Sequence, residues 1–383
     1  MNRKIERLFL FAHHSNSFHS VMKKEKWILF AIILSSVSFC RSQCLPKFPY
    51  KDGWLGADNA LSIKWADDQI LWIFSDTFVG SDGSSDREGS KIIANTAAIS
   101  TYKNNSWEIQ YFWKKKKSDD PQPIFKSSNH QNKFWPTEIF EFNNNLYVAL
   151  HEVAPKPEGG DDLFNFELRA TVVAEVKDFR DKTPDQWDIT YIEWPNTFDP
   201  NVWNGAMTIE ANFLYTFVGR DRKKYNLVRV LLSDLAAPLV SMEYLTLEGI
   251  WKPGYDRKNA HVLIEGTAGG SVIYHERTKK WVMIYGPDFL SNEIHIRCAE
   301  AITGPWSDAR VIYSVPELLP GESNYHKTYF SYGAREHPAF VDGVKDEAVI
   351  TYDCNSSDFN LLVHAMEIYT PKILQVDISK VCD

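Results

Sequence analysis

The chain has 383 residues, of which 44% are hydrophobic, 14% aromatic and 24% charged. This composition excludes a disordered or low-complexity protein, and only one apolar stretch is long enough to matter for a membrane. A net charge of −8 gives no basic footprint for nucleic acid. The 13 Trp, 17 Tyr and 23 Phe exceed the needs of a core, so we expect some to line a binding surface.

The N-terminal region has the pattern of a signal peptide. Three lysines precede an apolar run at 27–37, which is too short for a confident transmembrane helix. We expect residues 1–21 to be an upstream extension, 22–44 a signal peptide and 45–383 a single exported domain, periplasmic or extracellular. A buried helix, a membrane anchor and a lipid anchor through Cys40 are the alternatives, although Phe39 stands where a lipobox requires a small residue.

Four cysteines remain after this leader: Cys44, Cys298, Cys354 and Cys382. In an oxidising compartment they permit two disulfides in three connectivities. A closed ring fold would bring Cys44 and Cys382, at opposite ends of the domain, close together. No pair has the spacing of metal ligands, so we expect no zinc site.

After residue 45 the chain consists of short β-rich runs separated by polar turns, and five of these runs read as hairpins. The hairpins span residues 57–78, 137–152, 205–220, 269–288 and 336–353. Their turn centres, near 67, 144, 211, 278 and 344, recur at intervals of about 66 to 77 residues. Further strands are expected at 226–232 and 291–301.

A repeated unit of this length has room for about four strands, and a lone hairpin cannot bury its faces. Sheets arranged radially make a β-propeller, so five units predict an all-β, five-bladed β-propeller. A β-sandwich with irregular insertions is the alternative.

Hairpin register predicts a site at the open end of these units, because opposed residues have a constant index sum. With a turn centre near 67, Asp58 lies across from Asp76. Opposed like charges destabilise a hairpin, and they are usually tolerated when one carboxyl serves as an acid and the other as a base.

The same arithmetic places polar residues of the other hairpins at this end. It sets Glu138 opposite His151 and Glu152, Asn204 opposite Gly219 and Arg220, Asp288 level with Gly269, and Glu336 with His337 opposite Asp353. Glu210, Glu276 and Asp342 fall in the turns at the far end, and we interpret them as solvated turn residues.

Paired carboxylates carry out glycoside hydrolysis: one protonates the leaving oxygen, and the other attacks C1 or activates water. Their proximity helps to separate their pKa values. We predict Asp58, Asp76 and Glu138 as catalytic. The predicted substrate-binding or pKa-tuning residues are Trp54, Trp135, His151, Asn204, Arg220, Asp288, Glu336, His337 and Asp353.

Tryptophans support a carbohydrate ligand, since aromatic faces pack on the apolar faces of sugar rings. Trp54, Trp135 and Trp203 each stand shortly before a predicted site residue. Packing between blades is the alternative for each of them.

The segment 56–78, GADNALSIKWADDQILWIFSDTF, resembles the opening blade of five-bladed propeller glycoside hydrolases, and most closely glycoside hydrolase family 183, the endo-D-arabinofuranases. In that family an early Asp and the Asp of a Phe-Gly-Asp-Thr-like motif form the catalytic pair. Asp58 and Asp76 match them, with Ser75 in place of the usual Gly. FWPTE at 134–138 resembles a Trp-Pro motif of the second blade, where the family often has Asp in place of Glu138.

A second motif, AEAITGPW at 299–306, is similar to an outer-strand motif of five-bladed glycosidases, and we interpret its Glu300 as structural. The resemblance covers most of residues 50–370, with specific motifs in the first blade alone. It implies a furanosidase acting on arabinan-like polysaccharide first and a broader glycosidase second.

Two other functions compete with a secreted glycoside hydrolase. A non-catalytic glycan-binding propeller explains the tryptophans but not the opposed Asp pair. A polysaccharide lyase would use Arg220, Arg335, His337, Tyr325 or His326, against which the acidic ring argues. We expect no required cofactor, although a structural Ca²⁺ on the propeller axis is compatible with converging oxygen ligands. The expected partner is a poly- or oligosaccharide, with no nucleic acid and no transmembrane span, and the expected state is a monomer.

Overall fold

The computed structural model describes residues 45–156, 165–194, 204–221, 224–265, 270–288, 290–341 and 346–382. The chain divides into two compact units, Met1–Leu45 and Pro46–Asp383, and every strand and helix given below belongs to the second. The predicted leader at 1–44, with Cys40 and Cys44, lies outside the described residues. Within the described ranges, none of the helices has the length and apolarity that a membrane crossing requires.

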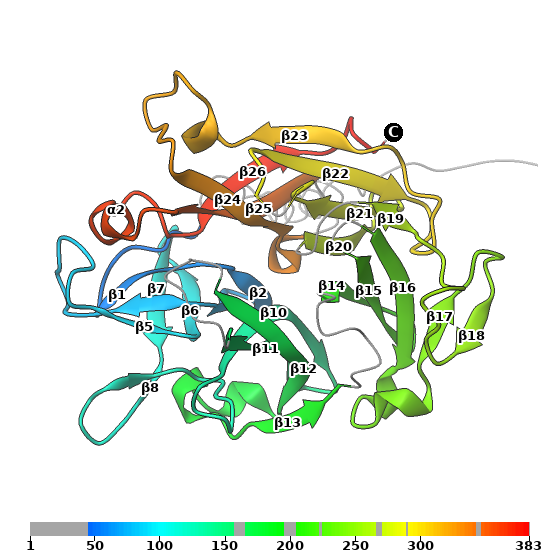
Figure 1. Ribbon diagram of the computed structural model, residues 1–383, viewed down its shortest axis with the longest axis horizontal. Helices are drawn as coiled ribbons and strands as arrows, with labels where there is room; N and C mark the ends of the chain where they lie inside the picture. The colour runs from blue at the N-terminus through cyan, green and yellow to red at the C-terminus, as the bar shows by residue number, and fades with distance from the viewer. Residues whose placement is uncertain are drawn as a thin grey trace, which may run out of the picture. The chain divides into compact units, whose positions relative to one another are not determined.

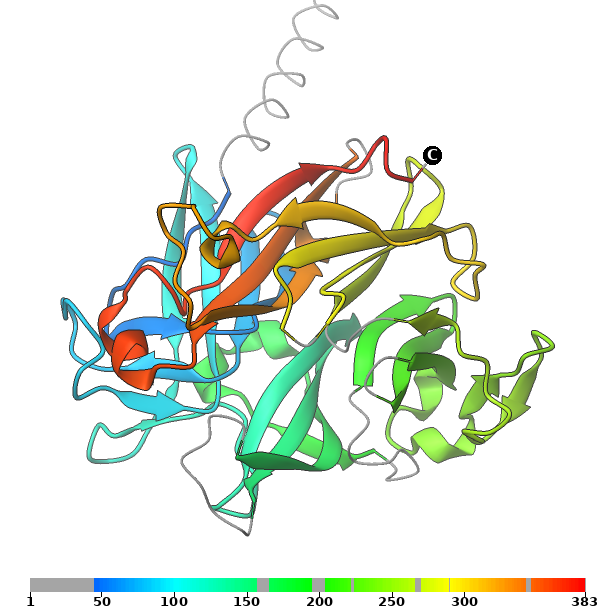
Figure 2. The same ribbon diagram turned by 45° about the horizontal axis from the view of Figure 1, so that its top comes forward.

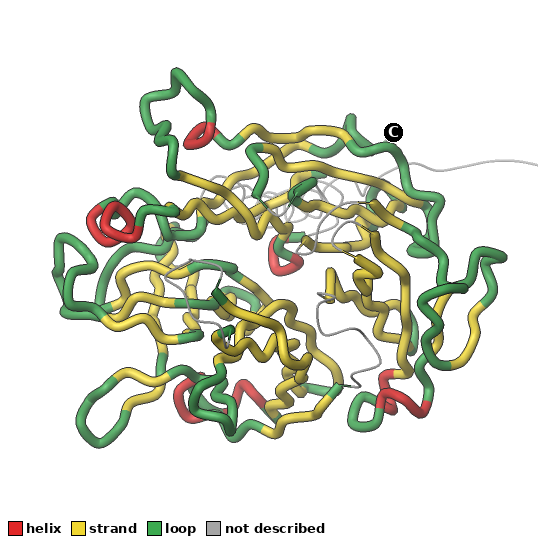
Figure 3. Tube along the Cα trace, viewed as in Figure 1, coloured by secondary structure: helices red, strands yellow, loops and turns green. Residues whose placement is uncertain are grey.

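Strands dominate the described chain (Figure 3). The first two large sheets are antiparallel and keep their strands in chain order. The first contains β2 (Leu61–Ala66), β3 (Gln69–Phe74), β6 (Thr96–Lys103) and β7 (Ser106–Phe112). The second contains β10 (Lys133–Phe142), β11 (Asn145–Pro155), β12 (Phe166–Val176) and β13 (Thr190–Glu193).

The next three sheets follow the same plan. The third contains β14 (Asn204–Glu210), β15 (Phe213–Asp221), β16 (Lys224–Leu231), β17 (Glu243–Leu245) and β18 (Trp251–Pro253), with β19 (Ile264–Glu265) paired to β16. The fourth contains β20 (Gly270–His275), β21 (Lys280–Tyr285), β22 (Glu293–Ala299) and β23 (Arg310–Ser314). The fifth contains β24 (Tyr329–Glu336), β25 (Glu347–Ser356) and β26 (Lys372–Asp377).

Shorter elements occupy the connections. A small sheet joins β1 (Trp54–Ala57), β4 (Thr77–Val79) and β5 (Lys91–Ile93), and β8 (Lys114–Lys115) pairs with β9 (Pro121–Gln122). The short 3₁₀ helices are η1 (Phe179–Asp181), η2 (Pro184–Gln186), η3 (Leu232–Asp234), η4 (Pro238–Val240), η5 (Pro316–Leu318) and η6 (Pro338–Phe340). The helix α2 (Phe359–His364) begins after Asp358, whose Oδ1 accepts the Leu361 N–H at 3.1 Å.

The five large sheets follow one another in cyclic order (Figures 1 and 2). The first strand of each sheet contacts the first strand of the next, in the order β2, β10, β14, β20 and β24. The helix η6, which directly follows β24, contacts β2. The last sheet therefore lies beside the first.

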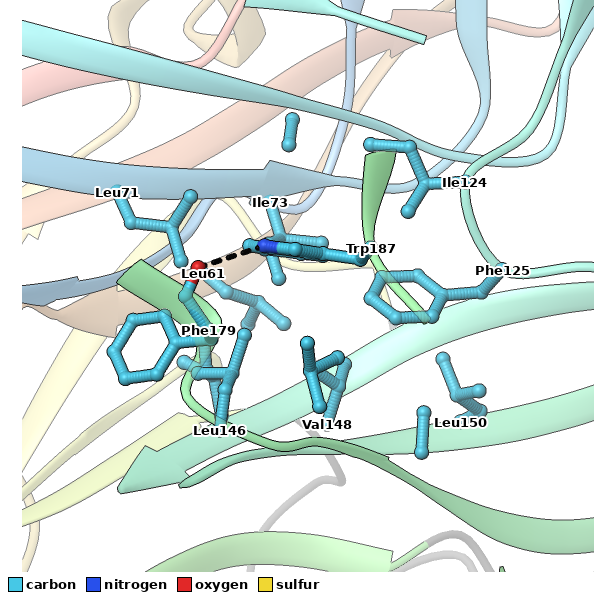
Figure 4. Close-up of a cluster of buried hydrophobic side chains, with 14 of the residues drawn as sticks. Leu61, Leu71, Ile73, Ile124, Phe125, Leu146, Val148, Leu150, Phe179 and Trp187 are labelled. Atoms are coloured by element: carbon cyan, nitrogen blue, oxygen red, sulfur yellow. Dashed lines mark hydrogen bonds between the residues drawn. The ribbon is translucent and has the colours of Figure 1, made fainter. Parts of the chain in front are cut away.

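Apolar side chains fill the space between neighbouring sheets. Figure 4 shows the cluster between the first and second sheets, where Leu71 and Ile73 lie with Leu146 and Val148, all fully buried. Trp187 packs against them, and its Nε1–H donates to the Phe179 carbonyl at 2.9 Å. Burying one such aliphatic side chain contributes about 1.5–3 kcal/mol.

A corresponding cluster connects the ends of the cycle. Trp72 and Phe74 of the first sheet lie in one apolar cluster, against which Phe340 of η6 and Ile373 of β26 pack. Further clusters join the second sheet to the third, the third to the fourth and the fourth to the fifth. Each large sheet therefore packs on both faces, and inner strands such as β3, β11 and β21 are almost continuously buried.

Four predicted hairpins are confirmed in position: β2–β3, β10–β11, β14–β15 and β20–β21. The turn between β10 and β11 consists of Asn143 and Asn144, both with positive φ (50° and 63°). Two such residues match the twist of antiparallel strands, and asparagine tolerates this conformation. The predicted strands at 226–232 and 291–301 correspond to β16 and β22.

The fifth hairpin differs from the prediction. Its first strand is β24, which ends at Glu336, and η6 follows where the second half of that strand was expected. Asp353 lies opposite Tyr332, so the predicted pairing of Asp353 with Glu336 and His337 is wrong. The register shifts between Tyr332 and Arg335, and a proline at 338 cannot donate to a strand ladder.

A disulfide joins Cys298 of β22 to Cys382, with 5.5 Å between their Cα atoms. Cys354 of β25 is a buried free thiol. This bond excludes a disulfide between Cys44 and Cys382, and the expected proximity of these two ends stays a prediction because Cys44 lies outside the described residues.

Candidate active site

The first hairpin brings Asp58 and Asp76 together, as predicted. Asp58 lies between β1 and β2, and Asp76 lies between β3 and β4. The Asp58 N–H donates to the Asp76 carbonyl at 3.3 Å, and the Ser75 N–H donates to the Asp58 carbonyl at 2.9 Å. Leu61 pairs with Ile73 and Ala57 with Thr77, so the register continues through this point with the same index sum.

Two tyrosines from the end of the chain contact Asp58. The Tyr332 hydroxyl donates to Asp58 Oδ2 at 2.6 Å, and the Tyr369 hydroxyl does so at 3.5 Å. The other oxygen, Oδ1, is buried and has no hydrogen-bond partner among the described residues. Burial first, and then the charge of Asp76, raise the pKa of Asp58 to about 7, while the tyrosine hydrogen bonds oppose this rise. Asp58 is therefore largely protonated just below neutral pH.

Asp76 has a different environment. Its side chain is 19% exposed, and its Oδ1 accepts the Trp135 Nε1–H at 3.1 Å and lies 3.6 Å from Lys133 Nζ. Burial raises the pKa of Asp76, and the Lys133 charge and the Trp135 hydrogen bond oppose the rise. The pair thus joins one carboxyl that accepts hydrogen bonds from neutral hydroxyls to one carboxyl that lies beside a cation.

A third carboxyl, that of Asp353 in β25, lies next to the pair. Asp353 is 2% exposed, and its Oδ2 accepts the Asn59 N–H at 2.8 Å. Burial and the neighbouring Asp58 raise the pKa of Asp353 well above its usual range, which favours its protonated form. Gly333 has φ of +69°, and a Cβ there would lie 2.5 Å from Asp353 Oδ2, so only glycine fits opposite this carboxyl.

Glu138 of β10 is held by a cation from the fifth sheet. Its Oε1 lies 3.3 Å from Arg335 Nη1, and the Arg335 Nη2–H donates to the Thr137 carbonyl at 3.0 Å. The Met207 N–H of β14 donates to Glu138 Oε2 at 3.4 Å. Burial raises the pKa of Glu138, and Arg335 opposes the rise. This carboxylate therefore links the second, third and fifth sheets.

The predicted placement of two residues of the site is wrong. Trp54 is fully buried and stacks on Tyr111 at 4.4 Å between ring centroids, so it belongs to the core rather than to a rim. Glu138 lies opposite Ala149, whereas His151 lies opposite Trp135. The bulge between Pro136 and Glu138 displaces this register. His151 is 1% exposed, and burial lowers its pKa to about 3.

Glu336 and His337 lie in a buried cluster between sheets. Glu336 pairs with His275 of β20, with 3.0 Å between Oε1 and Nε2. His337 bonds the Ser62 hydroxyl at Nδ1 and the Thr351 hydroxyl at Nε2, at 2.8 and 2.7 Å. Their predicted place beside Asp353 is therefore wrong.

Two further predicted residues, Asn204 and Arg220, are only partly described. Asn204 lies opposite Val218 rather than Gly219 or Arg220, because the register shifts between Asn204 and Met207. The side chains of Asn204 and Arg220, like all of Trp203 and Gly269, lie outside the described residues. Asp288 lies in the bend that follows β21.

The sequence prediction missed Tyr332, Tyr369, Lys133 and Asn59 and did not place Arg335 beside Glu138. Lys133 directly precedes the FWPTE motif, so its proximity could have been inferred from that position. Tyr332 precedes a glycine in a strand, which is typical of a bulge near a site. Tyr369 lies outside any strand, and nothing in its local sequence indicates the site.

No group of three or more His, Cys, Asp or Glu side chains in the described ranges is arranged to hold a metal ion. The carboxyls around Asp58 are instead occupied by hydroxyl, amide and cationic partners. The arrangement is suited to proton transfer between a protonated carboxyl and an ionised one.

Comparison of sequences places the chain in a family. A model of the family described as Domain of unknown function (DUF5005) matches residues 47–377. The chain belongs to this family. No curated protein matches this DUF5005 protein.

The chain is similar to several solved structures, and the first of those below shares its fold. A candidate hydrolase from Bacteroides ovatus is similar with a TM-score of 0.66 at 17% identity, over 85% of this chain and 86% of the other. An exo-β-1,3-galactanase from Phanerochaete chrysosporium gives 0.47 at 12% identity, over 88% and 66%. The catalytic domain of a GH62 α-L-arabinofuranosidase from Coprinopsis cinerea gives 0.47 at 10% identity, over 89% and 96%.

Proposed function

We propose that this DUF5005 protein is an exported glycoside hydrolase that cleaves a furanosidic, arabinan-like polysaccharide with the Asp58–Asp76 pair. The observation that carries the proposal is the pair itself: two adjacent carboxyls, one bonded by tyrosine hydroxyls and the other beside a lysine. Glycosidases need such a division, since one carboxyl must be protonated while the other is ionised.

The roles follow from the two environments. Asp58, whose pKa is raised to about 7, is the general acid and gives its proton to the leaving glycosidic oxygen as the C1–O bond breaks. Asp76, beside the Lys133 cation, is the carboxylate that attacks C1 or takes a proton from the water that does so. Glu138, fixed by Arg335, is the third carboxylate of the proposed catalytic set.

Adjacent backbone positions favour a short separation between the Asp58 and Asp76 carboxyls. A short separation is typical of retaining enzymes, in which water then hydrolyses a covalent glycosyl intermediate. Trp135 supports a sugar ligand, because it is partly exposed and donates to Asp76. The cyclic order of five sheets, each packed on two neighbours, supports a five-bladed propeller as the scaffold.

A lyase is less compatible with these contacts. A lyase needs a cation to neutralise the substrate's uronate, and Arg335 is 4% exposed and already paired with Glu138.

The test is incubation of the purified protein with plant, algal and bacterial polysaccharides, followed by chromatography of the products. The proposal predicts saturated oligosaccharides with new reducing ends from at least one furanose-containing polymer. Unsaturated products that absorb in the near ultraviolet would assign a lyase instead. Binding without product across the whole panel would assign a glycan-binding protein.

A further inference from the structure

A hollow on the outer flank of the first two sheets is lined by lysines although the chain as a whole is acidic. Its lining residues come from the segment that carries β8 and β9 and from the segment that leads into β13. Its lining includes four lysines, Lys114, Lys115, Lys116 and Lys126, and the single acidic residue Asp188. The carboxylate cluster around Asp58 contributes none of the lining residues.

The lysines differ in how firmly they are held. Lys114 Nζ donates to the Trp187 carbonyl at 3.4 Å and is half-buried, so it is fixed at the floor. Lys115 and Lys116 form ion pairs with Asp119 and Asp120, at 3.5 and 3.2 Å, in which both lysines are more than half exposed. Exposed pairs of this kind contribute about 0–1 kcal/mol, so a ligand anion can replace them at little cost.

An aromatic ring lies beside these cations. Tyr191 is 39% exposed, and its hydroxyl accepts the Lys126 N–H at 2.9 Å. Phe134 packs against the ring at 5.3 Å between centroids, which supports its position. The hollow thus offers cations, a fixed tyrosine and the Gln122 amide around one space.

We propose that this hollow is a second carbohydrate site, which binds an anionic glycan through its uronate or sulfate groups. Several convergent cations attract the charge, and a partly exposed aromatic ring matches the apolar face of a sugar. A nucleic acid fits less well, since it requires a basic stripe that neutralises many phosphates, and the protein carries a net charge of −8. The proposal does not depend on catalysis by Asp58.

The test is calorimetric titration with three defined glycans: an oligogalacturonate, a sulfated galactan oligosaccharide and a neutral dextran oligosaccharide. We expect one of the two anionic glycans to bind and the neutral one to bind at least tenfold more weakly. The anionic glycan that binds identifies the group as uronate or sulfate. Equal affinity for the neutral glycan, or binding of neither anion, would overturn the proposal.

Variants locate the binding. Lys114→Gln/Lys126→Gln should weaken the anionic complex about tenfold, and the exposed single variant Lys126→Gln about threefold. The matched control is Lys103→Gln/Lys177→Gln, which removes two exposed lysines outside the hollow and should change affinity less than twofold. Equal losses in both double variants would indicate general electrostatics and overturn the assignment.

Two further measurements test whether the hollow is separate from the Asp58 cluster and whether it prefers carbohydrate to nucleic acid. Asp58→Asn should bind the anionic glycan with unchanged affinity, even if it abolishes any cleavage, and loss of binding would contradict a separate site. A short DNA duplex of equal charge should bind at least tenfold more weakly than the glycan. Equal or tighter DNA binding would overturn the assignment to a carbohydrate.

Discussion

The cluster around Asp58 and the cluster around His337 both contain residues that the sequence assigned to one site, yet Asp58 and His337 themselves differ in how their polar atoms are paired. Glu336, beside His337, is held by its ion pair with His275, and neither of its oxygens has a hydrogen-bond partner among the described residues. His337 has a partner at each ring nitrogen and packs on Trp72 at 5.0 Å between centroids. Asp58 and Asp353 each have one buried oxygen without a hydrogen-bond partner among the described residues. A fully paired buried group stabilises the fold, whereas an unpaired one costs stability and points to a functional role.

The two clusters also differ in their connection to solvent. Asp76 is partly exposed beside Asp58, so a ligand can reach the first cluster. His337 and Glu336 are at most 1% exposed. Polar residues that alternate with apolar ones in the sequence can belong to either kind of cluster, and only the partners distinguish them.

The largest effect should come from the first cluster. Asp58→Asn removes the proposed general acid and should lower kcat/KM about a thousandfold, while the thermal midpoint stays near wild type. Asp308→Asn is the matched control, because it makes the same chemical change at an exposed position and should leave the rate unaltered. If the kcat/KM of Asp58→Asn is within tenfold of wild type, Asp58 is not the general acid.

The second cluster should respond in stability and not in rate. His337→Ala removes two buried hydrogen bonds and leaves a cavity beside Trp72, which should lower the free energy of unfolding by about 3 kcal/mol. The half-exposed His364 offers a control, since His364→Ala should cost little. Denaturant titration measures both. A loss of activity per folded molecule in His337→Ala would show that His337 does belong to the active site.

Tyr332→Phe tests the hydrogen bond that the Tyr332 hydroxyl donates to Asp58. The Tyr332 hydrogen bond stabilises the ionised form, so its removal should raise the pKa of Asp58 above 7. The alkaline limb of kcat/KM against pH should then move upward by about one pH unit, because Asp58 acts while protonated. Tyr329→Phe, on the same strand but bonded to Glu367, should leave the limb in place. A downward movement would contradict the assignment of Asp58 as the acid.

Asp353→Asn should have the smallest effect on rate, less than tenfold, because asparagine resembles the protonated carboxyl that the raised pKa of Asp353 favours. Its effect on stability depends on pH. Folded Asp353 keeps a proton that the unfolded chain releases above about pH 4, so this carboxyl lowers stability as the pH rises. The variant should therefore have a higher thermal midpoint than wild type at pH 8 and the same midpoint at pH 4. A lower midpoint at pH 8 would mean that Asp353 is ionised.

Register arithmetic predicted the site well in the first hairpin and poorly in the fifth, for a local reason. A two-residue turn joins β2 to β3, the register shifts by one between Ala66 and Lys64, and the index sum then stays constant to Asp58 and Asp76. In the fifth hairpin a bulge at Gly333 and the helix η6 change the sum, which moved Asp353 from His337 to Tyr332. Bulges depend on packing against neighbours, and a single sequence shows them only weakly.

The tyrosines of the site could not be derived from hairpin register. Tyr332 and Tyr369 reach Asp58 across more than 270 residues, because the last sheet packs beside the first. The position of Tyr369 depends further on Arg87, a buried guanidinium that donates to the carbonyls of Leu362 and Ile368 and so holds the loop after α2. The contacts of the two tyrosines with Asp58 depend on the packing of the last sheet beside the first, and the sequence around each tyrosine does not reveal them.

Trp54 shows the opposite failure. Its place just before Asp58 suggested a rim, but β1 turns its ring into the core against Tyr111 and Phe74. Trp135, at the corresponding place in the second sheet, does contact Asp76. Sequence position alone could not separate the two, because they differ in the face of the strand that each occupies.

The most direct test of a sugar-cleaving Asp58–Asp76 pair is chromatography of the products that wild type and Asp76→Asn release from the polysaccharide that the panel selects. The account predicts reducing oligosaccharides from wild type and none above background from the folded variant. Release at the wild-type rate by Asp76→Asn would contradict it.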